Sequence, residues 1–271
     1  MNCVGCNSKR IVKNGHYNSY QKYKCKSCGR QLTERSFSFF SRHRYPDSVI
    51  SNAILLNHQI STRMVKHFFR QNNVCFSHVS VYNWSKKFDK KLSNLGQVCR
   101  IGYTNIWHVD EKFVRVKDSK DAFAYLWVVE DTNNNIIAVN VTDGRDCQGA
   151  KHVFRKALAN AGFIPKIIVS DGLHGYKRAV KKIFGRRCKH VVRHFESKAI
   201  VLNRKVIYLS NNRIESLNSK INLWYKRFRG FKSLETANLW CEGWMYFYNL
   251  LRPRVNQEEK LRWKEAIALC I

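Results

Sequence analysis

Apolar side chains recur along this chain with spacings that predict an α/β domain after residue 104. Alternating apolar positions predict three strands, over 106–116, 125–130 and 136–141, with a turn at the Asn-rich run 132–135. The pattern then predicts a helix capped by Asp146 and ended by Gly162, a strand over 167–169, a helix over 172–184 and a strand over 187–192. Three antiparallel strands followed by alternating helix and strand are typical of a ribonuclease-H-like fold, which we expect over 104–253.

Shorter amphipathic segments precede this domain and predict three helices. Pro46 suits the start of the first, and Ser61 and Ser77 can cap the second and third. Short capped helices with a polar start on the last one predict a helix-turn-helix over 43–95, with a plain three-helix linker as the alternative. Its core would hold Val81, Trp84 and Phe88. We expect these side chains to face DNA: His78, Ser80, Tyr82, Asn83, Lys86 and Lys87.

Four cysteines near the amino terminus form two pairs, Cys3-x-x-Cys6 and Cys25-x-x-Cys28. Two such pairs at this separation are typical of one zinc ion held by four thiolates. The strands predicted between the pairs are too short for a core, so the metal would supply the folding energy of a zinc ribbon over 1–35. The ribbon would contact DNA or dock other protein, and four unrelated cysteines are the alternative. We expect core thiols at the remaining positions: Cys75, Cys99, Cys147, Cys188, Cys241 and Cys270.

The chain carries 49 Lys and Arg against 19 Asp and Glu, a formal net charge of +30. Residues 1–100 hold 18 basic and 3 acidic side chains, so the positive charge is spread rather than gathered in a tail. A nucleic acid is therefore the expected partner. An RNA-coating protein is the alternative, which seven Trp and a long patterned core disfavour. Without a signal peptide or an apolar run of ~18 residues, we expect a cytoplasmic, nucleoid-associated protein.

Three acidic residues stand out in this basic chain. Asp110 lies in the first predicted strand, Asp171 directly after the fourth, and Glu215 early in a helix. Carboxylates that converge from these places can hold two divalent metal ions, the arrangement used for in-line displacement at phosphorus. Glu111 points to the other face of its strand and is not expected to be a ligand. The alternatives are a solvated Asp110, a helix cap at Asp171, and a Glu215 that completes a capping box begun by Asn212.

Several motifs carry a resemblance over nearly the whole chain. They are Trp107-x-x-Asp110-Glu111, Gly144-Arg145-Asp146 with Ala150, Ser170-Asp171-Gly172-x-x-x-Tyr176, Asn211-Asn212-x-x-Glu215, Arg229-Gly230-Phe231-Lys232-Ser233 and Tyr248-Asn249-x-x-Arg252-Pro253. These motifs resemble DDE transposases of insertion sequence family six. The predicted ribbon and helix-turn-helix resemble those of archaeal and related members.

Two departures from that family's pattern change the prediction locally. Forty-three residues separate Asp171 from Glu215, more than is usual, so we expect a loop or hairpin over 195–210. Arg254 stands where a His is common, ahead of a carboxyl-terminal helix or tail over 254–271. Cys188, His190 and His194 form a second metal site in one interpretation and are ordinary strand or active-edge residues in the other.

The resemblance implies an enzyme that binds the terminal inverted repeats of its own element. It would cleave at the element ends and join a 3′-hydroxyl to target double-stranded DNA. Asp110, Asp171 and Glu215 would be the catalytic acids and would hold two magnesium or manganese ions, while Arg229 and Lys232 would contact DNA. Joining two ends implies a homodimer or larger assembly. The alternatives are a non-catalytic, domesticated DNA-binding protein and a hydrolytic nuclease of the same fold.

Overall fold

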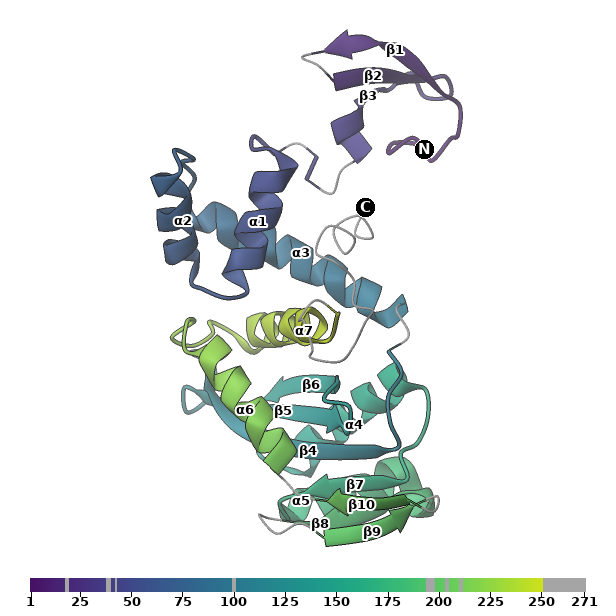
Figure 1. Cartoon of the computed structure of the whole chain (residues 1–271), viewed down its shortest axis with the longest axis vertical. Helices are drawn as coiled ribbons and strands as arrows, with labels where there is room; N and C mark the ends of the chain where they lie inside the picture. Colours follow the sequence, from purple (N-terminus) through teal and green to yellow (C-terminus); the bar gives the residue numbers. More distant parts are fainter. Residues whose placement is uncertain are drawn as a thin grey trace.

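The described part of the chain folds into three successive parts, which Figure 1 shows stacked along its long axis. A small antiparallel sheet comes first, made of β1 (Ile11–Tyr17), β2 (Tyr20–Cys25) and β3 (Gln31–Thr33). Helices α1 (Asp47–Asn57), α2 (Thr62–Gln71) and α3 (His78–Val98) follow. The computed structural model describes residues 1–17, 20–37, 40–41, 43–98, 101–193, 198–202, 205–209 and 212–250.

The helices of the second part begin at the predicted capping residues. The Ser61 hydroxyl accepts the backbone N–H of Met64 at 3.4 Å, and the Ser77 hydroxyl accepts that of Ser80 at 3.0 Å. Pro46 directly precedes α1. The predicted core positions of α3 are buried: Val81, Trp84 and Phe88.

The third part is built on a sheet in which five of the described strands run in the order β6-β5-β4-β7-β8. Strands β4 (Ile106–Arg115), β5 (Phe123–Asp131) and β6 (Ile136–Thr142) are antiparallel, whereas β7 (Ile167–Ser170) and β8 (Lys189–Val192) run parallel to β4. Helix α4 (Cys147–Ala161) leads into β7, and α5 (His174–Phe184) leads from β7 towards β8. This confirms the predicted α/β class and the ribonuclease-H-like order of strands.

A hairpin separates this sheet from the helix that carries Glu215. Strands β9 (Lys198–Leu202) and β10 (Lys205–Leu209) pair antiparallel and directly precede α6 (Asn212–Tyr225). The hairpin falls within the insertion predicted over 195–210. It explains the long spacing between Asp171 and Glu215.

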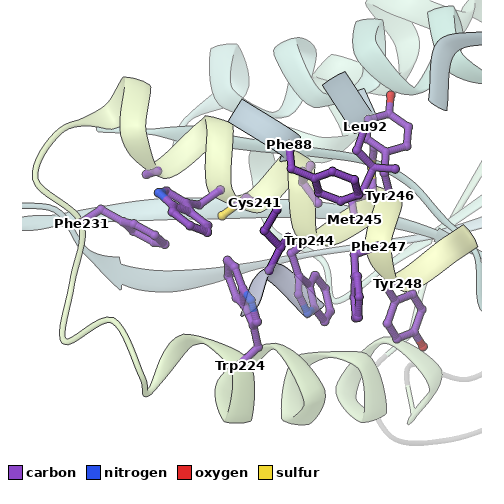
Figure 2. Close-up of a cluster of buried hydrophobic side chains, with 14 of the residues drawn as sticks. Phe88, Leu92, Trp224, Phe231, Cys241, Trp244, Met245, Tyr246, Phe247 and Tyr248 are labelled. Carbon is purple, nitrogen blue, oxygen red and sulfur yellow. The ribbon is translucent and has the colours of Figure 1, made fainter. Parts of the chain in front are cut away.

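Helix α7 (Leu234–Leu250) lies between the sheet and α3 (Figure 1). One face of the sheet packs on α4 and α5, and the other packs on α7. Phe88 and Leu92 of α3 belong to the same buried cluster as Trp244 and Met245 of α7 (Figure 2). The helical part and the sheet, predicted as separate modules, therefore share one apolar core.

Two asparagines of α7 bind the backbone of the edge strand β6. The Asn249 amide accepts the N–H of Ile136 at 2.9 Å and donates to its carbonyl at 2.7 Å. Asn238 does the same at Val141, at 2.9 and 3.1 Å. A carboxamide has an oxygen that accepts and an NH₂ that donates, so it can pair with a backbone N–H and C=O as a neighbouring strand would. Helix α7 therefore satisfies backbone groups of β6 that no described strand pairs on this edge of the sheet.

The cysteines outside the amino-terminal pairs do not share one environment. Cys188 and Cys241 are buried, as the prediction of core thiols requires, and Cys147 is half-buried. The prediction is wrong for Cys75, which is exposed in the loop before α3. Cys99 and Cys270 lie outside the described residues.

Candidate active site and nucleic-acid interface

Asp110 and Asp171 lie level with each other on neighbouring parallel strands. In the β4–β7 register His108 is opposite Val169, so the residues two positions further along each strand are also level. Those residues are Asp110, on β4, and Asp171, immediately after β7. Carboxylate oxygens of Asp110, Glu111 and Asp171 all lie within 4.8 Å of one another. The structure therefore brings together two of the three predicted acids and adds Glu111.

Glu111 is held by two donors that the sequence analysis did not pair with it. Arg145 Nε donates to Glu111 Oε1 at 2.7 Å, and Arg145 Nη2 forms a second contact with the same oxygen. The hydroxyl of the buried Tyr176, on α5, donates to Glu111 Oε2. As predicted, Glu111 and Asp110 leave opposite faces of β4. The Glu111 carboxylate nevertheless lies within 4.8 Å of the other two acids, where Arg145 and Tyr176 hold it.

Helix α6 is joined to the acids through Asn218. Its side-chain amide donates to Asp110 Oδ2 at 2.6 Å, and Lys112, on the same face of β4, donates to the Asn218 carbonyl at 3.3 Å. Glu215 precedes Asn218 by one turn, about 4.5 Å along the helix axis. Its exposed carboxylate is not in the group within 4.8 Å and forms no hydrogen bond to a described residue.

Two of the alternative roles for the acids concern the starts of helices. Glu215 stands three positions after Asn212, the first residue of α6. Asp171 has a local structural role, because its side chain accepts the N–H of Leu173 at 3.1 Å at the start of α5.

Burial and the neighbouring acids raise the pKa of Asp110 to about 6. Burial is the main cause, followed by the charges of Glu111 and Asp171, while the Asn218 amide acts in the opposite direction. Burial also lowers the pKa of the neighbouring His108 to about 4, so this imidazole is neutral at pH 7. An all-carboxylate donor set whose charges repel one another suits Mg²⁺ or Mn²⁺, which prefer oxygen ligands.

A pH dependence follows from the raised pKa of Asp110. Its ordinary value is 3.8, so the folded chain binds this proton more tightly than the unfolded chain. The contribution of Asp110 to the free energy of unfolding therefore falls as the pH rises from about 4 to 6 and stays low above that. We expect Mg²⁺ to raise the Tm at pH 8 more than at pH 5, because bound cations relieve this repulsion.

Differential scanning calorimetry with EDTA or MgCl₂ measures this effect. Asp110→Asn should raise the Tm of the metal-free protein at pH 8 and remove most of the increase caused by Mg²⁺. Asp121→Asn, at an exposed acid outside the cluster, is the matched control and should leave both values unchanged. An equal Mg²⁺-dependent increase in Asp110→Asn would show that this carboxylate is not a ligand.

The four amino-terminal cysteines come together beside β2. Their sulfur atoms lie within 4.8 Å of one another, with 3.6 Å between Cys3 and Cys28 and between Cys6 and Cys25. Four sulfurs bonded to a tetrahedral zinc at about 2.3 Å would be about 3.8 Å apart. The backbone N–H of Cys28 lowers the pKa of Cys25 to about 6, which favours its thiolate. The backbone N–H of Ser8 acts in the same direction on Cys6, but the other three thiols and burial raise the pKa of Cys6 to about 12. The spacing of the four sulfurs fits zinc.

The predicted DNA contacts lie on two neighbouring elements. On α3, Asn83, Lys86 and Lys87 are exposed, whereas Ser80 and Tyr82 are half-buried. Tyr82 packs on Trp240 of α7, with ring centroids 5.6 Å apart. The loop between α6 and α7 carries the exposed Arg229 and Lys232, and it shares a pocket with the first turns of α3.

The remaining candidates are only partly covered by the structure. His190 Nε2 lies 2.9 Å from the Ser170 hydroxyl, and it forms no metal-type cluster with Cys188 within the described residues. His194, Asn211, Arg252, Pro253 and the segment 254–271 lie outside that part of the chain. No helix in the described ranges has the length and apolar character needed to cross a membrane.

A ribonuclease-H-like sheet with level carboxylates from adjacent strands defines a class of enzymes that process phosphodiesters with divalent metals. Comparison with family models places this chain within that class. The model DDE_Tnp_IS240, described as a DDE domain, matches residues 104–254, more than half of the chain. The chain belongs to this family of DDE transposases. It is a DDE polynucleotidyl transferase, which carries out metal-dependent DNA cleavage and strand transfer.

Two of the solved structures that are similar to this chain share little sequence with it. The catalytic core of HTLV-2 integrase with magnesium, in its trimeric form, is 17% identical, covering 61% of this chain and 99% of that one, with a TM-score of 0.37. The simian T-cell lymphotropic virus intasome with the PP2A subunit B56 gamma is 13% identical, covering 80% and 74%, with a TM-score of 0.40. No curated protein matches this chain.

Proposed function

We propose that this transposase mobilises an insertion sequence of family six, with Asp110, Asp171 and Glu215 as its catalytic acids. The observation that carries the proposal is the level pair Asp110 and Asp171, with α6 bonded to Asp110 through Asn218. This contact holds α6, the helix that bears Glu215, against β4, the strand that bears Asp110. These contacts argue against the alternative that Asp110 is simply a solvent-exposed acid on a strand, because such an acid would not be bonded to a helix or lie beside a second acid.

Each residue around the acids has a separable task in this proposal. Asp110, Asp171 and Glu215 would hold two Mg²⁺ or Mn²⁺ ions, which activate the attacking oxygen and stabilise the leaving oxygen at phosphorus. Asn218 orients Asp110 through its 2.6 Å hydrogen bond. Arg145 and Tyr176 hold Glu111, so that its charge is balanced beside the other acids.

The amino-terminal parts would select the DNA on which this site acts. The cysteine cluster would bind one zinc ion and fold β1–β3 as a ribbon. Helices α1–α3 would act as the helix-turn-helix that reads the terminal inverted repeats of the element, with α3 in the groove. The +30 net charge supports binding to double-stranded DNA by several surfaces. Because two ends must be joined, the working form would be a homodimer or larger assembly.

Single substitutions on α3 test this assignment in the full chain. Truncation would not, because α3 shares its core with α7. We expect Asn83→Ala to reduce the preference for fragments from the two element ends over random DNA. Lys86→Ala should weaken binding to both alike and reduce the slope of log affinity against log salt by about 0.9, one phosphate contact.

Competition binding at several salt concentrations provides the measurement. Lys181→Ala, on the exposed face of α5, is the control and should bind like the parent protein. If Asn83→Ala keeps the full preference for the element ends and Lys86→Ala keeps the full salt slope, α3 does not contact the DNA.

A further inference from the structure

A pocket of about 460 Å³ lies between the helix-turn-helix and the loop that joins α6 to α7. Asn57, Tyr82 and Asn83 line it from the helical part, and Phe228 and Lys232 line it from the loop. Its volume falls in the range of small-molecule sites, about 300–1,000 Å³. No acidic side chain is among its described lining residues. The pocket is therefore suited to an uncharged or anionic group of limited size.

Aromatic rings form the floor and two sides of this pocket. Phe231 and Trp240 make the floor and are only 3% and 1% exposed. Phe228 and Tyr82 both contact Trp240, at centroid distances of 5.3 and 5.6 Å, but they are only half-buried. Both residues line the pocket and keep part of their surface exposed, although Trp224, Phe231 and Arg227 also lie against the Phe228 ring. Flat aromatic surfaces of this kind are what nucleic-acid bases stack on.

Polar groups are placed around these rings. The guanidinium of Arg227 lies 4.8 Å from the centre of the Phe228 ring and bonds the Asn57 carbonyl, which fixes the loop against α1. Asn83 and Lys232 are exposed at the pocket. A carboxamide can donate to and accept from a base edge, and an ammonium group binds a phosphate.

We propose that this pocket takes one unpaired nucleotide of the bound DNA. Its base would stack beside Phe228 and Tyr82, and its phosphate would lie at Lys232. A paired base cannot offer its face to a ring, so the nucleotide must be unstacked from the duplex or already unpaired. The inference deepens the transposase function and rests on the proposed role of α1–α3 in binding DNA.

The position of the pocket predicts where the unpaired nucleotide lies. Glu215 is in the first turn of α6, and the pocket is formed just after α6 ends. From Glu215 to Tyr225, the last residue of α6, the helix rises about 15 Å. For DNA that runs along α6 at about 3.4 Å per nucleotide, the unpaired nucleotide would lie roughly four to five nucleotides from the bond that is cleaved.

Fluorescence of 2-aminopurine tests the proposal with the full-length protein. The probes are a duplex with one unpaired 2-aminopurine, the same duplex fully paired, and the free 2-aminopurine nucleotide. We expect the unpaired duplex to bind about 5- to 100-fold more tightly than the paired one, with its emission quenched by stacking. Phe228→Leu keeps apolar volume but removes the ring, so it should lose this preference while it retains its affinity for paired DNA.

Controls separate the pocket from the other proposals. Phe113→Leu changes an exposed ring outside the pocket and should behave like the parent protein. Phe228→Met, which also keeps apolar volume without a ring, repeats the test if Phe228→Leu does not fold. Equal binding of the two duplexes, an unchanged preference in both pocket variants, or equally tight binding of the free nucleotide would overturn the proposal. If instead the helix-turn-helix assignment were wrong, Asn83→Ala and Lys86→Ala would bind paired DNA like the parent protein, whatever the result with the unpaired duplex.

Discussion

Glu215→Gln will fold normally, bind the element ends and lose strand transfer by about three orders of magnitude or more. A metal ligand loses a charged oxygen in this change, and a factor of a thousand is about 4 kcal/mol of transition-state stabilisation. Asp110→Asn and Asp171→Asn should behave alike. Any pair of these substitutions should add little to a single one, because residues that act as a unit are not additive. The measurement is strand transfer by purified protein with Mg²⁺.

Glu235→Gln is the matched control for this prediction. Glu235 is exposed in the first turn of α7, as Glu215 is in the first turn of α6, and it lies away from the acids. This control should retain full activity. If Glu215→Gln kept more than about a tenth of the parent rate, the loss would be at most ~1.4 kcal/mol, the size of a capping effect, and Glu215 would not be a ligand.

The sequence predicted the positions of the acids better than their surroundings. Asp110 lies within one recognisable strand and Asp171 directly follows another, and the parallel register of these adjacent strands makes them neighbours. The bonds of Glu111 to Arg145 and Tyr176 were not predicted, since these residues are 34 and 65 positions away. The alternation of side chains along a strand predicts the face from which a side chain leaves. It does not predict which distant residues a long side chain such as that of Glu111 contacts.

Removal of zinc will unfold the first 33 residues while the sheet β4–β8 remains intact. Among its described residues, the small sheet buries one minor cluster, Cys3, Cys25 and Leu32, with partial cover from Ile11, Tyr23 and Phe37. A structural zinc contributes about 10–16 kcal/mol to such modules. Cys25→Ser should therefore reduce the zinc content from about one per chain to near zero and remove amide protection from β1–β3 alone.

Metal analysis and hydrogen exchange give the two readouts. Cys75→Ser is the control, because Cys75 is an exposed cysteine outside the cluster, and it should keep both zinc and protection. Native protein purified without chelators that contains no zinc would contradict the prediction. So would full protection of β1–β3 in Cys25→Ser.

The three helices before the sheet were predicted, but their packing against α7 was not. Capping serines and apolar spacing mark α2 and α3 within the chain, since these signals are local. Helix α7 is buried over most of its surface, including Trp240, Trp244 and Phe247. Such a helix must be covered on both sides. The periodicity of apolar residues does not predict that α3 is one of the elements that pack on α7.

The shared core has a consequence for the inheritance of specificity. Phe88 and Leu92 of α3 pack into the same cluster as Trp244 and Met245 of α7, so these positions must change together to preserve packing (Figure 2). A chimera that received only residues 43–98 from a relative would combine α3 with an α7 that did not evolve beside it. Because α7 in turn packs on the sheet and bonds to β6 through Asn238 and Asn249, the helical part is inherited together with the catalytic core and not as an exchangeable module.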